Sequence, residues 1–290
     1  MASSNMQDIK RRMRSVNSTE HITNAMKLVS AAKLRKAKAT FEKTIKYFHY
    51  ITEAIENIFN NVSDIPEMYL KGSREIKNTC YIIVTSNRGL CGSFNSNVIK
   101  LAEEVLAKDE GNPIVVAIGT KGKEYFEKRG YKIYSEYAAP PENISFLETR
   151  QISKPILDMY TAGEIDEIVL IYTSYASSLE QDAKSVTLLP FDPEVDPDMY
   201  DSFDREVEYE PSVEEVFNYL IPKYVEIMIY GAVISSATCE HAARRMAMEN
   251  ATDNAREMLG ELSLFYNRAR QAAITNEIIE VVSGSDAQNG

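Results

Sequence analysis

The sequence predicts an α/β fold in which the two chain ends form a long antiparallel pair of helices around a compact, mainly parallel sheet domain. Three observations predict it. No Gly or Pro occurs between Met1 and Val62, so one helix can occupy that whole stretch. A second helical run occupies residues 212–284, and residues 78–191 alternate between short apolar strands and helical segments. These three ranges are the expected domains.

The N-terminal helix is predicted over residues 1–62. A helix of that length spans roughly 85 Å, whereas the average helix has about 11 residues, so it needs a partner along most of its length. Its apolar residues recur mostly at steps of three or four residues, or multiples of these, which places them on one face. They include Ile9, Met13, Val16, Met26, Leu34, Ala37, Phe41 and Ile45.

The C-terminal helix is predicted to begin at the capping box "SVEE", residues 212–215. Pro222 is expected to kink or restart this helix, and Gly231 and Gly260 are expected to allow close helix packing. Because the two helices are the two chain ends, an antiparallel pair is the natural arrangement. The apolar positions include Val216, Leu220, Ile227, Ile234, Met246, Leu259, Leu262, Phe265, Ile278 and Val281.

The middle of the chain changes its period. Short apolar runs at residues 80–86, 113–119, 131–137, 167–175 and 185–191 predict strands, and helical segments separate most of them. Such alternation favours a mainly parallel sheet covered by helices. A strongly acidic loop, residues 191–211, then leads to the C-terminal helix.

Charge is distributed unevenly along the chain, whose net charge is −11. Residues 10–46 hold eleven Lys and Arg against two acids, and residues 190–217 hold eleven acids against Arg205 alone. The basic segment is either a solvated helix face or a surface for an acidic partner protein. Nucleic acid is disfavoured because aromatic residues are not interleaved with these cations.

The chain carries little catalytic equipment. "SNRGLCGSFN" at residues 86–95 and "GTKGK" at residues 119–123 follow strands, but neither matches a dinucleotide or phosphate-loop pattern, so both are expected to be structural turns. His21, His49 and His241 are scattered, and no metal-spaced cluster or nucleophile motif occurs. We therefore expect no cofactor and no metal.

Cysteine usage and hydropathy predict the compartment. Three Cys without a CxxC spacing predict free thiols in a reducing compartment. The sequence shows no apolar run approaching 18 residues, so no membrane span is expected. The basic N-terminus continues into the helix without a break, so a removed presequence is not expected.

Three segments resemble one family. "ITNAMKLVSAAKLRKAK" (residues 22–38), "VTSNRGLCGSFNSNV" (84–98) and "ATDNAREMLGELSLFYNRARQAAITNEIIEVVSGS" (251–285) are similar to motifs of the gamma subunit of F-type ATP synthase. The match covers the chain in the right order; Ser285 stands where the family commonly has Ala. The resemblance implies an antiparallel coiled coil plus a Rossmann-like domain that binds no nucleotide.

The resemblance also implies a function and a location. The chain would be a non-catalytic rotor subunit that couples ion-driven rotation of a membrane ring to ATP synthesis or hydrolysis at beta subunits. Its partners would be an alpha3–beta3 hexamer, the epsilon subunit and the membrane c-ring. A bacterial type is implied, peripheral on the cytoplasmic face of the cell membrane. Chloroplast members carry a redox-active Cys pair in an extra segment, and no Cys lies between Cys91 and Cys239 here, so no thiol regulation is expected.

The family's contact residues map onto positions of this sequence. Contacts with the beta subunits are implied for the N-terminal helix and for the end of the C-terminal helix, and contacts with the membrane ring for the acidic loop. The beta contacts are Met26, Lys27, Lys33, Arg35, Lys36, Arg270, Gln271, Thr275 and Glu277, and the ring contacts are Tyr209 and Glu210.

Two other classes of function remain open on the residues. One is an α/β enzyme that binds a nucleotide at its sheet, with the helices as an accessory arm. The other is a coiled-coil adaptor without a rotary role. Nucleotide binding by the isolated chain would favour the enzyme, and failure to co-purify with an alpha–beta hexamer would favour the adaptor.

Overall fold

A computed structural model gives the structure of the chain and describes residues 2–61, 66–72, 75–137, 144–177, 180–191 and 212–289. Contacts between residues divide the chain into two compact units. One consists of Met1–Ala31 with Arg244–Gly290, and the other of Ala32–Ala243. The three expected domain ranges remain a prediction, because both long helices contribute residues to both units. Each unit is described by itself.

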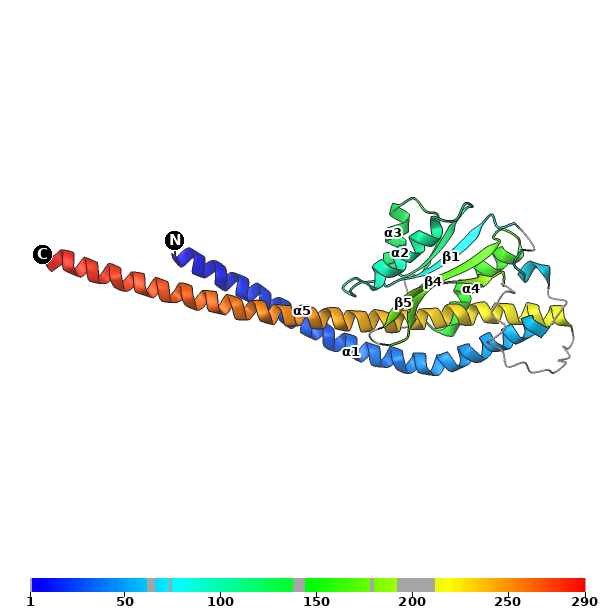
Figure 1. Ribbon diagram of the computed structural model, residues 1–290, viewed down its shortest axis with the longest axis horizontal. Helices are drawn as coiled ribbons and strands as arrows, with labels where there is room; N and C mark the ends of the chain where they lie inside the picture. Colours follow the sequence, from blue (N-terminus) through cyan, green and yellow to red (C-terminus); the bar gives the residue numbers. More distant parts are fainter. Residues whose placement is uncertain are drawn as a thin grey trace. The chain divides into compact units, whose positions relative to one another are not determined.

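Both predicted terminal helices are present. Helix α1 spans Ala2–Asn61 and helix α5 spans Val213–Asn289 (Figure 1). The amide of Glu215 donates to Ser212 Oγ at 3.2 Å, which is the first half of the predicted capping box. The predicted restart at Pro222 is wrong, because α5 continues as a helix through it. Phe217, Ile221 and Val225 around the proline are buried in the core, and their burial offsets the lost backbone hydrogen bond.

The larger unit contains a five-stranded sheet in the order β3-β2-β1-β4-β5. The strands are β1 Thr79–Val84, β2 Ile114–Ile118, β3 Ile133–Tyr137, β4 Glu167–Tyr175 and β5 Gln181–Leu189. All neighbours run parallel except β4 and β5. The connection from β4 to β5 is too short for a crossover, so these two strands form an antiparallel pair at the edge. The predicted mainly parallel sheet is confirmed.

Helices cover both faces of this sheet. Helix α2 (Phe94–Leu106) and helix α3 (Thr120–Lys128) lie over one face, where buried residues of α2 and Phe126 of α3 share a core cluster with Tyr81, Ile83 and Val115 (Figure 1). Since every residue of β1 is buried, this central strand packs on both sides. A short 3₁₀ turn, Glu67–Tyr69, precedes β1.

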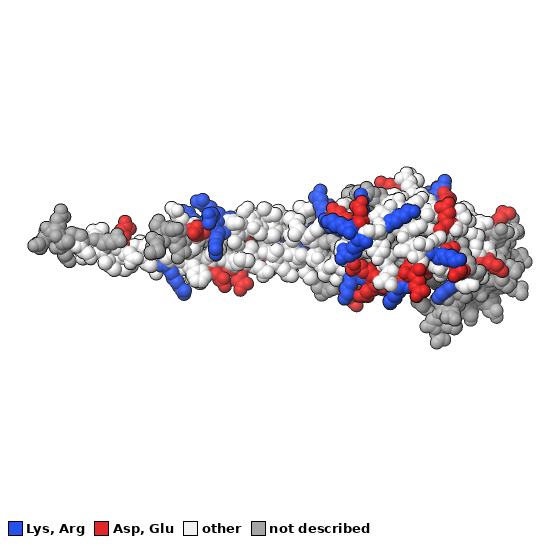
Figure 2. All heavy atoms as spheres, turned by 90° about the horizontal axis from the view of Figure 1, so that it is seen from above, with Lys and Arg blue, Asp and Glu red and all other residues white. Residues whose placement is uncertain are grey.

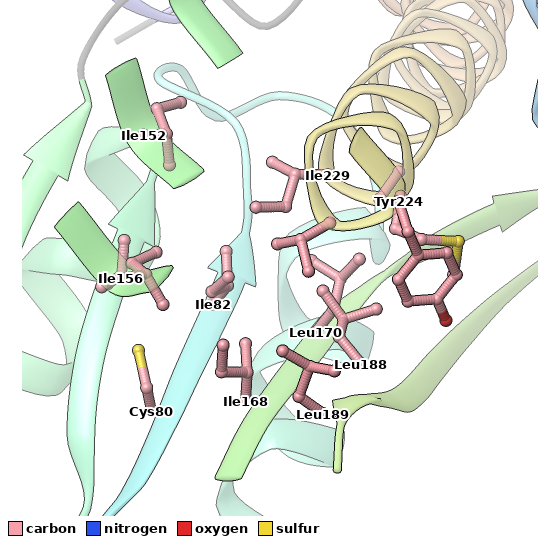
Figure 3. Close-up of a cluster of buried hydrophobic side chains, with 14 of the residues drawn as sticks. Cys80, Ile82, Ile152, Ile156, Ile168, Leu170, Leu188, Leu189, Tyr224 and Ile229 are labelled. Atoms are coloured by element: carbon pink, nitrogen blue, oxygen red, sulfur yellow. The ribbon is translucent and has the colours of Figure 1, made fainter. Parts of the chain in front are cut away.

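The other face is covered by helix α4 (Phe146–Thr161) and the first part of α5. Figure 3 shows Ile152 and Ile156 of α4, Tyr224 and Ile229 of α5 and Ile82 of β1 pointing into one cluster. The carboxylate of Glu226, with its side chain 4% exposed, contacts Arg150 at 3.5 Å and Lys223 at 3.2 Å. Helix α5 is thereby fixed to the sheet domain by apolar packing and by a paired buried charge.

The smaller unit is a pair of helices. The hydroxyl of Thr252 donates to Thr23 Oγ1 at 2.8 Å, and the guanidinium of Arg256 contacts Glu20 at 3.0 Å. Residue numbers therefore rise on α5 while they fall on α1, so the two helices are antiparallel, as predicted. The buried residues of this unit include polar and small side chains as well as an apolar one. They are Glu20, Thr23 and Ser30 on α1, and Met248, Thr252 and Ala255 on α5.

The last turns of α5 extend beyond its partner. If the pairing of Thr23 with Thr252 continues one for one, the start of α1 lies opposite about residue 273. Beyond that point, large apolar side chains of α5 are exposed. They are Ile274, Ile278, Ile279, Val281 and Val282, which we call the apolar overhang. Phe265, predicted to pack in the helix pair, is also 54% exposed.

Within α5, between Glu215 and Ser283, one window of 18 residues is apolar enough to cross a membrane by length and composition alone. Of this window, 72% is buried inside the protein, as in the core helix of a folded domain.

Candidate functional site

The carboxyl edge of the sheet is where α/β domains commonly bind nucleotides, through free amides at a helix N-terminus. Here the first three amides of α3 already have partners within the chain. Thr120 N donates to Asn87 Oδ1 at 2.9 Å, Lys121 N to the Ser86 carbonyl at 3.0 Å, and Gly122 N to Thr85 Oγ1 at 2.8 Å. Two side chains and one backbone carbonyl of the chain itself occupy the place that a phosphate would take.

The loop before α2 is likewise held by its own polar groups. Ser86 N donates to Asn95 Oδ1 at 3.0 Å, and Asn95 Nδ2 donates to Ser86 Oγ at 2.7 Å. Ser86 Oγ also donates to the Arg88 carbonyl at 2.7 Å. These bonds support the interpretation of residues 86–95 as a structural turn.

Two cavities of the larger unit differ from a nucleotide site. One, of about 100 Å³, lies between α1, β4 and α5 and is lined by Phe41, Tyr172, Tyr175 and Ile234 among others. That volume is below the usual range for ligand pockets, about 300–1,000 Å³. The other, of about 660 Å³, is lined by residues such as Asn112 at the amino ends of the strands, the edge opposite the usual nucleotide site.

The thiols are poorly suited to nucleophilic chemistry. Cys80, Cys91 and Cys239 are free and buried, in agreement with the sequence. Burial raises the pKa of Cys80 and of Cys239 to about 12, so neither forms a thiolate near neutral pH. Throughout the described residues, no three His, Cys, Asp or Glu side chains are gathered as a metal site requires.

The predicted contact residues lie on the long helices and not in a cleft. On α1, Met26 and Lys27 are partly buried, while Lys33, Arg35 and Lys36 are exposed. Successive helix positions turn by about 100°, so Lys33 and Lys36 share a side, whereas Arg35 lies about 160° away from Lys33. Lys36 lies between Lys33 and Arg35 on the exposed side, and buried Leu34 and Ala37 lie on the opposite side. The three exposed cations therefore spread over about 160° of the helix surface.

On α5, the four predicted residues are exposed and form two pairs. Arg270 and Glu277, seven positions apart, share one side of the helix. Gln271 and Thr275 share another, and the Thr275 hydroxyl donates to the Gln271 carbonyl at 2.9 Å. Tyr209 and Glu210, predicted for the ring contact, lie outside the described residues.

Charge on the sheet domain is mixed in sign. Figure 2 shows Lys and Arg interleaved with Asp and Glu over the face of the sheet domain that it presents. Lys121 pairs with Glu124 at 2.7 Å and Arg129 with Glu103 at 2.9 Å. Such exposed, mutually paired charges do not make the single-sign field that a nucleic-acid site needs.

The sequence reasoning missed a group of polar residues between the helices, formed by Glu20, Thr23, Thr252 and Arg256, which we call the interhelical polar cluster. Thr252 is fully buried, and the side chain of Glu20 is 11% exposed. Its signal was present in the sequence. Glu20 and Thr23 stand four and seven residues after Val16, at the spacing of the apolar stripe, which a search for apolar residues alone passes over.

Comparison with known proteins adds sequence and fold relatives. A family model described as "ATP synthase" matches residues 5–287. The ATP synthase gamma chain of Alkaliphilus metalliredigens is 46% identical over 97% of this chain and 98% of its own length. A sodium-ion-specific gamma chain from Acetobacterium woodii is 40% identical over 98% of this chain and 99% of its own length.

Solved structures agree on the fold. The central stalk and c-ring of the Tetrahymena thermophila mitochondrial ATP synthase matches with a TM-score of 0.63 at 25% identity, over 79% of this chain and 99% of that one. The Euglena gracilis enzyme in rotational state 3 matches with a TM-score of 0.69 at 16% identity, over 99% of this chain and 95% of that one. At the lower identity, the likeness concerns the fold alone.

Proposed function

Because the chain belongs to the ATP synthase gamma chain family, it is a central-stalk subunit of that complex, and we propose that it is the rotor that couples ion-driven turning of a membrane ring to ATP synthesis or hydrolysis. The chemistry of ATP is assigned to the beta subunits. The chain contributes contacts that differ between open and closed catalytic sites, which is what can shift their equilibrium.

One observation carries this proposal, the apolar overhang of α5. Ile274, Ile278, Val281 and Val282 fall within about 100° of one another around the helix and form a stripe, and each is 48% exposed or more. Burying apolar surface gains roughly 25 cal/mol per Å², so a partner that encloses this stripe is favoured. An alpha3–beta3 hexamer with a central bore is such a partner.

Further features support a non-catalytic part in the complex. The amides at the start of α3 are occupied by Asn87, Ser86 and Thr85, which disfavours the nucleotide-binding enzyme. The exposed cations Lys33, Arg35 and Lys36 are proposed to face acidic loops of beta, together with Met26 and Lys27. Arg270, Gln271, Thr275 and Glu277 are proposed to meet a second beta loop.

The remaining part of the proposal concerns the partners at the membrane end of the rotor. We assign the ring contact to Tyr209 and Glu210 and a further contact to an epsilon subunit. The assembled complex is proposed to be peripheral on the cytoplasmic face of a bacterial membrane, with the moving ion crossing the ring and not this chain.

The decisive experiment assembles the chain with alpha and beta subunits of its own organism. A rotor is expected to co-purify with three alpha and three beta subunits and, with a bead attached to its sheet domain, to turn in one direction when ATP is added. The Arg270→Ala, Gln271→Ala double variant is expected to assemble normally and turn over more slowly. A hexamer that forms with a static chain would contradict the rotor and favour the adaptor.

A further inference from the structure

We propose that the interhelical polar cluster fixes the axial register of α1 against α5, so that Glu20 and Arg256 are positioning residues of this helix pair. The proposal rests on the proposed rotor function, because it concerns the axial alignment of the proposed beta-contact residues on the two helices. The family resemblance assigned no role to either residue.

The contacts across the pair are specific. Arg256 Nε donates to Glu20 Oε1 at 3.0 Å, and Arg256 Nη2 reaches the same oxygen at 3.0 Å. Three residues further along α1, Thr23 Oγ1 accepts from Thr252 Oγ1 at 2.8 Å. Two independent polar contacts therefore form at the same axial register of the two helices, and a shift of one helix along the other would break both.

Other charged groups around the cluster lie on the same helices as its members. His21 Nδ1 lies 3.4 Å from Glu20 Oε2, and Asp253 lies 3.5 Å from Arg256 Nη1. Each of these contacts joins neighbours within one helix, so it survives any sliding of the pair. Only the contacts from Glu20 to Arg256 and from Thr23 to Thr252 report the register.

The remaining seam discriminates weakly between registers. Its other buried residues are Ser30, Met248 and Ala255, and small or flexible side chains tolerate a shift of one turn. A one-turn slip moves one helix by about 5.4 Å along the other. It would leave the Glu20 carboxylate, whose side chain is 11% exposed, without its guanidinium, which is unfavourable even though the Arg256 side chain is 53% exposed. A polar group buried in the seam is the best attested way to set register in paired helices.

Register matters because the proposed beta contacts come from both helices of this unit. Met26 and Lys27 stand three to four residues beyond Thr23 on α1, whereas Arg270 and Gln271 stand on α5. A slip changes their relative height by one turn while it leaves each residue exposed to the same degree. Coupling between rotation and catalysis should therefore suffer while the complex still assembles.

The test measures register by cross-linking in the assembled complex, with Cys80, Cys91 and Cys239 replaced by Ala. Seven residues on each helix separate Thr23 from Val16 and Thr252 from Leu259, so Val16→Cys with Leu259→Cys reports the native register. Val16→Cys with Leu262→Cys reports a slip of about one turn. Both reporter pairs leave the polar cluster intact.

Four charge variants are compared in each of the two cysteine reporter pairs. Glu20→Arg or Arg256→Glu alone is expected to lower the native cross-link about five-fold and to raise the slipped one, and the double exchange is expected to restore the native yield. The exposed neighbour Glu257→Arg makes the same charge change as Glu20→Arg and should leave both yields unchanged. Ion pumping per ATP hydrolysed should fall in the single variants and recover in the exchange.

Unchanged cross-links in the single variants, or a double exchange that fails to restore them, would overturn the proposal. If the cross-links shift as expected while ion pumping per ATP hydrolysed stays the same, the claim that register affects coupling is wrong. The cross-linking readout does not require rotation, so a chain that fails to turn in its hexamer contradicts the proposed function separately.

Discussion

At the scale of single residues, Gly119 shows how tightly the sheet domain is built. Its φ of 101° lies in a region that side chains rarely adopt, and a Cβ there would lie 2.1 Å from the Thr85 carbonyl oxygen. The same Thr85 binds the amide of Gly122. At the turn where nucleotide-binding domains hold a phosphate, two backbone segments of this chain cross closely.

Gly119→Ala should therefore destabilise the sheet domain. Backbone strain alone costs roughly 1–3 kcal/mol, and the overlap with Thr85 adds to it. Gly130→Ala is the control, because Gly130 has a φ of 81° with nothing within 4 Å of its Cβ position, and it should cost only about 1–2 kcal/mol. Urea unfolding measures the free energy of unfolding of both variants, and hydrogen exchange of residues 79–128 shows where in the domain stability is lost. Equal losses of stability in the two variants would contradict this account.

Glu167 should make the stability of the domain depend on pH. Burial raises the pKa of its carboxyl group above 4.5, and nearby Asp109 raises it further, while a hydrogen bond from Thr79 lowers it. The folded state thus holds this proton more tightly than the unfolded chain, so stability present at low pH is lost as pH rises through the folded pKa.

Glu167→Gln removes that loss. The variant should gain stability relative to the wild type as pH rises above about 4.5 and reach a constant advantage above the folded pKa. Urea unfolding between pH 4 and 8 measures the difference. A difference independent of pH would show that Glu167 does not titrate in this window.

At the scale of elements, the sequence predicted the two helices and the five strands because each follows from local periodicity and breakers. It failed where neighbours decide. The helix does not restart at Pro222, because the core holds α5 there. Glu20 and Thr23 were overlooked because a search for apolar residues alone passes over polar side chains at the spacing of the buried stripe.

The site was predicted less completely than the fold. Motif resemblance gave positions along α1 and α5, but the side of a helix on which a residue lies becomes meaningful only once the buried seam is known. Lys33 and Lys36 share a side, and Arg35 does not. That difference separates residues that the sequence grouped together.

The two sides can be tested separately in the assembled enzyme. Exposed ion pairs are each worth about 0–1 kcal/mol, so Lys33→Glu with Lys36→Glu should slow ATP synthesis by up to about 30-fold. Arg35→Glu alone should change it by about two-fold or less if beta meets the lysine side. A larger effect of Arg35→Glu would place the acidic partner nearer to Arg35 than to the two lysines.

At the scale of the whole molecule, the apolar overhang makes the isolated chain incomplete. Ile278 is 58% exposed and Val281 is 67% exposed on one side of α5. Exposed apolar stripes of this kind promote association with any available surface. Without its partner, the chain should associate with itself.

Ile278→Ser with Val281→Ser should lower that self-association and, in the assembled enzyme, weaken retention of the chain. Light scattering over a range of concentrations measures the first effect, and washing of the complex at raised salt measures the second. Ser283→Ala is a control, because it changes an exposed residue of the same turns without removing apolar surface. Unchanged self-association of the double variant would show that the apolar stripe is not the surface through which the chains associate.

The unbroken course of α5 has a mechanical consequence. Within the smaller unit, α5 pairs with α1 around Thr252 and continues alone from about Ile274. Support by neighbours therefore decreases along a single rod, and its resistance to twisting should decrease with it. Such a rod behaves as a torsion spring that is stiff at its base and compliant at its tip. It can take up elastic strain when one end advances steadily and the other waits, and return it when the waiting end is released.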